Sequence, residues 1–361
     1  MLDVSAAGPR DVVVAPSALV ELMSTLHVMA EPEHHPEATD WIDAASARMR
    51  PAIQQELSLF APLWARYRCR LLFPLDLPLA AGLDAELARV RAMDLDRFVG
   101  LMAQGVIGML RADVPKAEEL LAGGEPAASY VRQCARRSYA RGELARLLVS
   151  DPPGCRDRLL EVLQKVSDDF FAETWSTLRP GLEQDAAILR RELGRRELAA
   201  VLAGLHPTAT RMGSSAKVRF DKLQRDEAVV GPRPLVLVPS NRVWPHLTVK
   251  TEHPSLIVVH YAVRSSAPFG ELSLRELQGR LTAFTSPGRM EVCRHLLSEP
   301  ITTSELAARL GWSNPQVSRT LRQLRDAGLV QSVRDGRLVR HRLDIEVVRR
   351  LGDDLLATIM R

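Results

Sequence analysis

The chain has 361 residues, of which 46% are hydrophobic, and a formal net charge of +4 at pH 7. This length allows two or more domains, each with its own hydrophobic core. The sequence contains no run of about 18 apolar residues, and residues 1–10 lack the basic start and apolar stretch of a secretory signal. We therefore expect a cytoplasmic protein that does not enter the membrane.

The four cysteines are far apart in the sequence and form no Cys-x-x-Cys pair, which argues against a disulfide framework and against a zinc knuckle. They are Cys69, Cys134, Cys155 and Cys293. We expect them to act as small buried hydrophobic residues.

Residues 1–265 are predicted to form one α+β domain, mostly helical with a small antiparallel sheet. The β-branched segment 11–15 predicts a strand, and Pro16-Ser17 then starts a helix. Amphipathic spacing predicts further helices over 83–93, 95–112, 127–148, 156–178 and 182–202. The periodicity then changes to that of strands, over 217–220, 235–238, 247–250 and 256–262. We expect the N-terminal strand to join this antiparallel sheet.

Positive charge is concentrated after this domain. Residues 280–343 contain eleven arginines and five acidic residues, a net charge of +6, which leaves −2 for the rest of the chain. A basic module attached to a nearly neutral body is typical of a nucleic-acid reader with a separate sensing or assembly domain. Residues 264–270 are the best linker candidate, so we predict a second domain over 272–361.

The second domain has the signals of a winged helix-turn-helix. Residues 272–284 predict one helix, and Ser286-Pro287 starts the next. In that next helix we expect four residues to share the buried face: Met290, Cys293, Leu296 and Leu297. Thr302 or Thr303 can cap the third helix, Glu305 is placed for a capping box with Thr302, and Gly311 makes the tight turn.

The fourth helix is the predicted recognition helix. Ser313 is its N-cap, and Val317, Leu321 and Leu324 form a buried stripe. The opposite face is polar and basic and suits a major groove. The predicted DNA-binding residues here are Ser313, Asn314, Gln316, Ser318, Arg319 and Arg322. The alternative is that Arg319 and Arg322 are solvated charges that pair with residues such as Asp326. Trp312, in the turn, is expected to pack in the core.

Residues 329–343 predict a β-hairpin, the wing. Asp335-Gly336 suits a type I′ turn. Arg334, Arg337 and Arg340, with Arg342, are placed to neutralise phosphates or to enter an adjacent minor groove.

In this order the motifs resemble the ArsR family of winged-helix repressors over about residues 272–361. They read Leu281-x-x-Phe284-x-Ser286-Pro287-x-Arg289, Ser304-Glu305-Leu306-Ala307-x-x-Leu310-Gly311, Val317-Ser318-Arg319-x-Leu321-x-x-Leu324-x-x-Ala327-Gly328-Leu329-Val330 and Gly336-Arg337-x-Val339-x-x-Arg342-Leu343. The resemblance implies a symmetric homodimer that binds a palindromic double-stranded DNA operator and is released by an effector. It also implies that residues 272–284 and 345–360 form the dimer interface.

The sequence departs from the metal-sensing members of that family. The positions of their Cys-x-Cys pair hold Thr302 and Ser304, which are not ligands for soft metals. Their C-terminal helix carries Asp and His ligands, whereas residues 345–361 contain Asp353 and Asp354 but no histidine. We expect no metal ligand and no cofactor.

Residues 11–263 resemble a domain of unknown function that precedes ArsR-type helices in actinobacterial regulators. Leu235-Val-Leu-Val-Pro-Ser240 and Trp244-Pro245 carry this resemblance. It implies no particular activity.

Histidines of the first domain raise the question of a metal site. His27, His34 and His35 are close in sequence, but three carboxylates surround them, Glu31, Glu33 and Glu37. This composition favours a solvated loop over a ligand set. The remaining histidines of the domain are scattered, and we expect them to be structural; they are His206, His246, His253 and His260.

Residues 129–139 contain Ser, Tyr and Cys at helical spacing, but no nucleophile elbow, phosphate loop or Gly-x-Gly-x-x-Gly accompanies them. We therefore predict that the protein is not an enzyme. It is predicted to be a sequence-specific DNA-binding transcriptional regulator that acts as a homodimeric repressor. Its first domain is predicted to sense a small-molecule or protein effector. The alternative is a protein-interaction or ligand-binding module in which the winged helix serves assembly and not DNA recognition.

Overall fold

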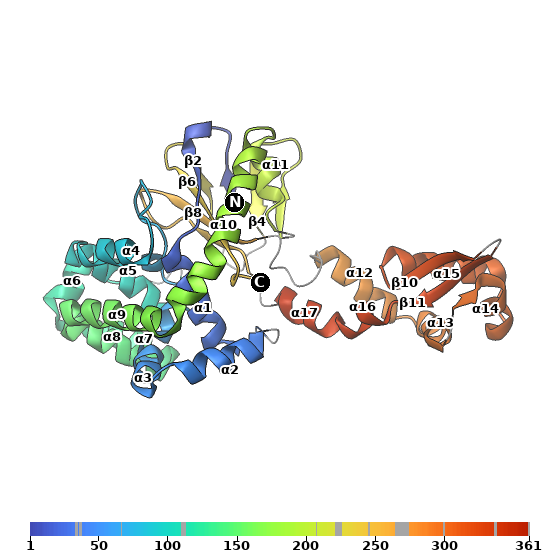
Figure 1. Ribbon diagram of the computed structural model, residues 1–361, viewed down its shortest axis with the longest axis horizontal. Helices are drawn as coiled ribbons and strands as arrows, with labels where there is room; N and C mark the ends of the chain where they lie inside the picture. Colours follow the sequence, from blue (N-terminus) through green and yellow to red (C-terminus); the bar gives the residue numbers. More distant parts are fainter. Residues whose placement is uncertain are drawn as a thin grey trace. The chain divides into compact units, whose positions relative to one another are not determined.

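The computed structural model describes residues 1–361 except 33–34, 36–37, 66, 110–112, 207, 221–225, 245, 264–273, 299, 336–337 and 360–361. The chain forms two compact units, Met1–Phe269 and Gly270–Arg361 (Figure 1). The predicted linker, 264–270, lies outside the described residues. The α+β class predicted from the sequence is confirmed.

Helices make up most of the first unit. They are α1 (Ala18–Ala30), α2 (Thr39–Arg48), α3 (Pro51–Phe60), α4 (Leu83–Arg91), α5 (Leu95–Ile107), α6 (Ala117–Ala122), α7 (Gly124–Arg137), α8 (Tyr139–Ser150), α9 (Pro152–Val166), α10 (Ala172–Leu193) and α11 (Leu198–Ala203). At the starts of α1, α8 and α9 a side chain accepts a backbone N–H group. Ser17, for example, accepts from the N–H of Val20 at the start of α1.

The strands of the first unit are β1 (Leu2–Asp3), β2 (Val12–Val14), β3 (Ala209–Arg211), β4 (Lys217–Phe220), β5 (Ala228–Val229), β6 (Leu235–Ser240), β7 (Thr248–Lys250) and β8 (Ile257–Ala262). They form two four-stranded sheets, with orders β3-β4-β1-β5 and β2-β6-β8-β7. In the second of these, β2 and β8 both run parallel to β6, and β7 runs antiparallel to β8.

The expected single antiparallel sheet is therefore wrong, although the predicted N-terminal strand does join β6. β2 and β6 are parallel because the long segment between them returns to the end of the sheet at which β2 begins. β7 runs back antiparallel to β8, so β6 and β8 are parallel as well. Every residue of β6 and of β8 is buried. Strands of a parallel sheet that are covered on both faces have nearly continuous apolar runs, and residues 235–238 and 256–259 show this pattern.

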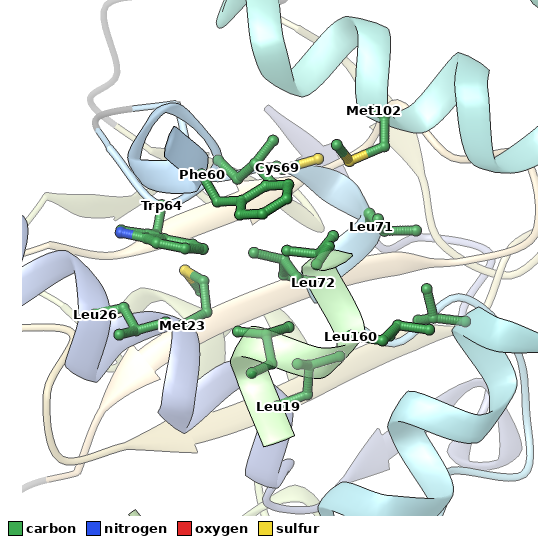
Figure 2. Packing of buried hydrophobic residues seen from close by; sticks show 14 of the residues in the cluster. Leu19, Met23, Leu26, Phe60, Trp64, Cys69, Leu71, Leu72, Met102 and Leu160 are labelled. Atoms are coloured by element: carbon green, nitrogen blue, oxygen red, sulfur yellow. The ribbon is translucent and has the colours of Figure 1, made fainter. Parts of the chain in front are cut away.

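The two faces of the β2-β6-β8-β7 sheet belong to different hydrophobic clusters. Val236 and Val238 of β6 pack into the large helical cluster. Leu235 and Leu237 point the other way, into a cluster that includes residues of α10 and α11. Figure 2 shows part of the helical cluster, in which large buried side chains such as Trp64 pack closely together. The sheet is thus a middle layer between two cores.

Several predicted helix boundaries are wrong. The expected helix 182–202 ends at Leu193, and α11 begins only at Leu198. The expected helix 127–148 is split at Ser138, whose side chain accepts from the N–H of Arg141 and caps α8. The expected break between 178 and 182 is absent, because α10 continues through Pro180. Ser176, whose carbonyl loses its partner at Pro180, lies on an exposed part of the helix, so water can satisfy it.

The second unit is a winged helix. Its elements are α12 (Leu274–Phe284), α13 (Pro287–Ser298), β9 (Ile301–Thr302), α14 (Thr303–Leu310), α15 (Asn314–Asp326), β10 (Val330–Asp335), β11 (Leu338–Leu343), α16 (Ile345–Arg349) and α17 (Leu351–Ile359). The strand order of its sheet is β10-β11-β9, all antiparallel. β9 was not predicted, because two residues are too short to show a periodicity.

Within the described part of the chain, no helix combines the length and the apolar character that crossing a membrane requires.

Candidate nucleic-acid interface

The turn between α14 and α15 is built by local hydrogen bonds. The side chain of Thr302 accepts from the N–H of Glu305, and the Glu305 carboxylate accepts from the N–H of Thr302 at 2.8 Å. This capping box confirms the predicted start of α14. Gly311 ends the helix with φ +63°, a left-handed conformation that glycine adopts without strain. Ser313 then caps α15 by accepting from the N–H of Gln316.

α15 separates an apolar face from a polar one. Val317, Leu321 and Leu324 are buried in the core of the second unit, as predicted. The six predicted contact residues at and after the start of α15 are exposed: Ser313, Asn314, Gln316, Ser318, Arg319 and Arg322. Successive residues of a helix are rotated by about 100°, so Arg319 and Arg322 lie opposite the buried stripe, while Asn314 and Gln316 flank it.

The alternative interpretation of this face, in which Arg319 and Arg322 pair with Asp326, has no support in the geometry. Among the described residues, neither guanidinium forms an ion pair or a hydrogen bond with another side chain. Two exposed cationic groups that are not engaged by the protein can contact phosphate or base edges without first breaking an internal pair.

The wing places its arginines on different faces. Arg334 of β10 lies opposite Val339, whereas Arg340 of β11 lies opposite Val333, on the other face of the hairpin. Arg334 is exposed; Arg340 is partly buried, donates to the carbonyl of Pro300 at 3.4 Å and lies 3.9 Å from the Glu305 carboxylate. Arg337 lies outside the described residues. The structure therefore does not bring Arg334 and Arg340 together into one patch.

Comparison with known proteins gives two family matches. Residues 1–267 match a "Family of unknown function (DUF5937)", and residues 284–333 match a "Helix-turn-helix domain". The chain belongs to the DUF5937 family. Its second unit is an ArsR-type helix-turn-helix domain, as the sequence motifs predicted.

Two individual proteins resemble the ArsR-type domain. The HTH-type transcriptional regulator NmtR of Mycobacterium tuberculosis is 31% identical over 93 residues, which are 26% of this chain and 78% of NmtR. The crystal structure of NolR from Sinorhizobium fredii has 26% sequence identity and a TM-score of 0.20, and the match covers 25% of this chain and 96% of NolR.

Positions of the family's metal-sensing sites have other roles in this ArsR-type domain. Thr302 caps α14 with its hydroxyl. Asp354 of α17 accepts from Arg280 of α12 at 2.9 Å, and both side chains are less than one-fifth exposed. This buried pair joins the two terminal helices within one chain.

Two details of the ArsR-type domain were predicted incorrectly. The expected helix 345–360 is divided at Arg350 into α16 and α17. Gly352, in the first turn of α17, lowers helix propensity there by about 1 kcal/mol relative to alanine. In α13, Val292 is buried with Cys293 and Leu296, whereas Met290 and Leu297 are 43% and 55% exposed. Trp312 packs against Gly288 of α13, as expected for a core residue.

His341 of β11 is a structural residue of this domain that the sequence did not identify. Its Nδ1 lies 2.8 Å from the Ser332 hydroxyl of β10, and its Nε2 lies 3.2 Å from the Thr303 hydroxyl of α14. The side chain is buried, so it links the wing to the helix-turn-helix. Burial, with a smaller contribution from Arg325, lowers the pKa of His341 below its usual value of 6.5.

We expect this histidine to make the protein less stable in acid. Since the folded state lowers the pKa, the stabilisation by neutral His341 is complete above about pH 6.5 and is lost as the pH falls through the lower pKa of the folded state. The thermal unfolding midpoint should therefore fall more between pH 7.5 and 5.0 for the unaltered chain than for His341→Gln. Equal falls would show that His341 does not contribute to the pH dependence.

Proposed function

We propose that the protein is a homodimeric transcriptional regulator, a repressor, that binds a palindromic double-stranded DNA operator with α15 in the major groove. The observation that supports this most directly is the exposed face of α15, where Arg319 and Arg322 are not engaged by other described side chains. NmtR, a transcriptional regulator by name, provides independent support.

The two kinds of DNA contact come from different elements in this proposal. Arg319 and Arg322, with Asn314, Gln316 and Ser318, read base edges, because arginine and the amide side chains can form bidentate bonds to guanine and adenine. The exposed N-terminus of α15 at Ser313 and the wing residues Arg334, Arg337 and Arg340 contact phosphates, which position the domain without reading sequence. In a symmetric dimer the two recognition helices then require half-sites about 34–36 Å apart.

The first unit senses an effector, a small molecule or a partner protein, in this proposal. It comprises about three-quarters of the chain, yet the ArsR-type domain alone covers 78% of the relative NmtR. A large additional domain joined to a DNA-binding domain is suited to control the DNA affinity of that domain.

The dimer uses the outer face of α12 in this proposal. Leu274 and Leu281 are seven residues apart on that helix, so they share a face, and they are 52% and 37% exposed. Exposed leucines aligned along a helix are typical of an interface with another chain.

The test of DNA binding uses the purified full chain, its own upstream DNA and a random duplex as competitor at several salt concentrations. We expect the upstream DNA to be bound at least about 10³-fold more tightly than the random duplex, with affinity that decreases linearly with salt on a double-logarithmic scale. Binding to both DNAs with equal affinity, or to neither, would contradict the proposal and favour the assembly-module alternative.

A separate prediction concerns the dimer. Leu281→Glu places a charge on the proposed α12 interface, and we expect it to weaken dimerisation by tenfold or more, measured by sedimentation equilibrium, since each tenfold change corresponds to about 1.4 kcal/mol. Leu297→Glu on α13 is the matched control, because Leu297 is also an exposed leucine but lies on a different helix. A Leu281→Glu protein that dimerises like the control would exclude α12 from the interface.

A further inference from the structure

Three histidines from separate segments of the first unit converge in its interior. His27 lies in the last turn of α1, His35 follows that helix, and His246 lies between β6 and β7. One ring nitrogen of each lies within 4.8 Å of those of the other two. Their exposed fractions are 1%, 1% and 6%, so the expectation of a solvated loop is wrong for His27 and His35, while His34, Glu33 and Glu37 lie outside the described residues.

The ring positions match the geometry of a metal centre. The ring centroids are separated by 5.3 Å for His27–His35, 5.3 Å for His27–His246 and 5.8 Å for His35–His246. Three imidazoles bound to one tetrahedral ion with bonds of about 2.0–2.1 Å have centroids about 5.2 Å apart. The planes meet at 70° to 89°, so no two rings stack, and reorientation of the rings is the main change needed for all three nitrogens to bind one ion.

A neighbour fixes the tautomer of the neutral His27 ring. Its Nδ1 lies 2.8 Å from the carbonyl oxygen of Trp64, which can only accept a hydrogen bond. Nδ1 therefore carries the proton, and the lone pair of the neutral ring is on Nε2. Histidines that bind metals commonly donate their second N–H to a backbone carbonyl in this way, which fixes the tautomer and the ring orientation.

The backbone N–H groups of the other two histidines form hydrogen bonds. The N–H of His35 donates to the carbonyl of Pro32 at 3.0 Å, and the N–H of His246 donates to the carbonyl of Val243 at 2.7 Å. The segment before His246 is also attached to α1, because the N–H of Asn241 donates to the Glu21 carboxylate at 3.2 Å. Each of the three histidines is thus tied to a neighbouring residue by at least one hydrogen bond.

We propose that His27, His35 and His246 bind a divalent first-row transition metal ion such as Zn²⁺ or Co²⁺. Imidazole nitrogen is a preferred ligand for these ions, whereas Mg²⁺ and Ca²⁺ require oxygen ligands. Three histidines leave at least one coordination position for water. The site lies in the first unit, and its proposal does not depend on the proposed DNA binding.

The test uses the full chain after chelator treatment and dialysis. We expect one Co²⁺ per chain, with the strong visible absorption of a four-coordinate Co²⁺ ion, and a higher thermal unfolding midpoint with Zn²⁺ but not with Mg²⁺. His35→Gln and His246→Gln should each lower the affinity by more than tenfold and abolish the Zn²⁺-dependent rise. His260→Gln is the control, because His260 is equally buried but lies outside the cluster, and it should bind normally.

A measurement on the unaltered protein keeps the test decisive if a glutamine variant fails to fold. Zn²⁺ should shift the imidazole nitrogen NMR signals of three histidines, with the Nδ1–H of His27 retained. No stoichiometric binding, unchanged binding in both folded variants, or shifts confined to other histidines would overturn the proposal.

Discussion

Arg319→Ala is expected to weaken binding to the specific operator by about tenfold to hundredfold, while binding to random DNA changes only a few-fold. A bidentate arginine contact to guanine contributes about 1–3 kcal/mol of discrimination between bases. Loss of one positive charge also weakens any DNA complex, but this electrostatic effect is the same for every sequence. Competition binding with operator and random duplex at one fixed salt concentration measures both effects.

The control for this prediction is Arg132→Ala. Arg132 is an exposed arginine of α7 in the first unit, 2.5 Å from Glu125, so the variant has the same change in net charge without a change in α15. It should bind both DNAs like the unaltered chain. If Arg319→Ala reduced operator and random binding equally, Arg319 would contact phosphate and would not read a base.

Gly105→Ala should destabilise the first unit by about 1–3 kcal/mol, although alanine has the higher helix propensity. Gly105 lies in α5, and a Cβ atom there would be 2.3 Å from Sγ and 2.7 Å from Cβ of Cys69. Both α5 and the segment that contains Cys69 belong to the buried core. The added methyl group therefore forces a backbone shift, which makes overpacking costly. Urea unfolding of the full chain measures the loss.

Gly100→Ala is the matched control in the same helix. A Cβ at Gly100 would meet only Ala117 Cβ, at 3.9 Å, an ordinary van der Waals distance. This variant should be as stable as the unaltered chain or more stable by up to about 1 kcal/mol, through helix propensity alone. Equal stability of the two variants would mean that α5 and the Cys69 segment do not approach as closely as described.

The ArsR-type domain could be predicted almost completely from the sequence because its signals are local. Caps at Thr302 and Ser313, the left-handed Gly311 and the stripe Val317–Leu324 each act within one or two helix turns. These interactions form between residues that are near each other in the chain, so residue order is sufficient to recognise them. The sequence did not show which arginines share a face of the wing. Only the strand register shows that Arg334 and Arg340 lie on opposite faces.

The fold of the first unit was harder to predict from the sequence, because the contacts that determine it join residues far apart in the chain. The sheet direction depends on where β2 and β8 lie relative to β6, which no local pattern specifies. The histidine cluster is a second example: His246 is more than two hundred residues from His27, and sequence proximity drew attention to His34 instead. Only the folded arrangement shows which histidines meet.

The pairing of β2 with β6 also has a consequence during synthesis. Val12 pairs with Leu235, which the ribosome adds 223 residues later. At about 5–20 residues per second, the Val-rich strand emerges roughly 10–45 seconds before its partner exists. During that time its apolar side chains and open hydrogen-bonding edge are available to other nascent chains or to a chaperone. This interval ends before the ArsR-type domain has been synthesised. The β2–β6 pairing of the first unit can therefore form before the DNA-binding domain emerges.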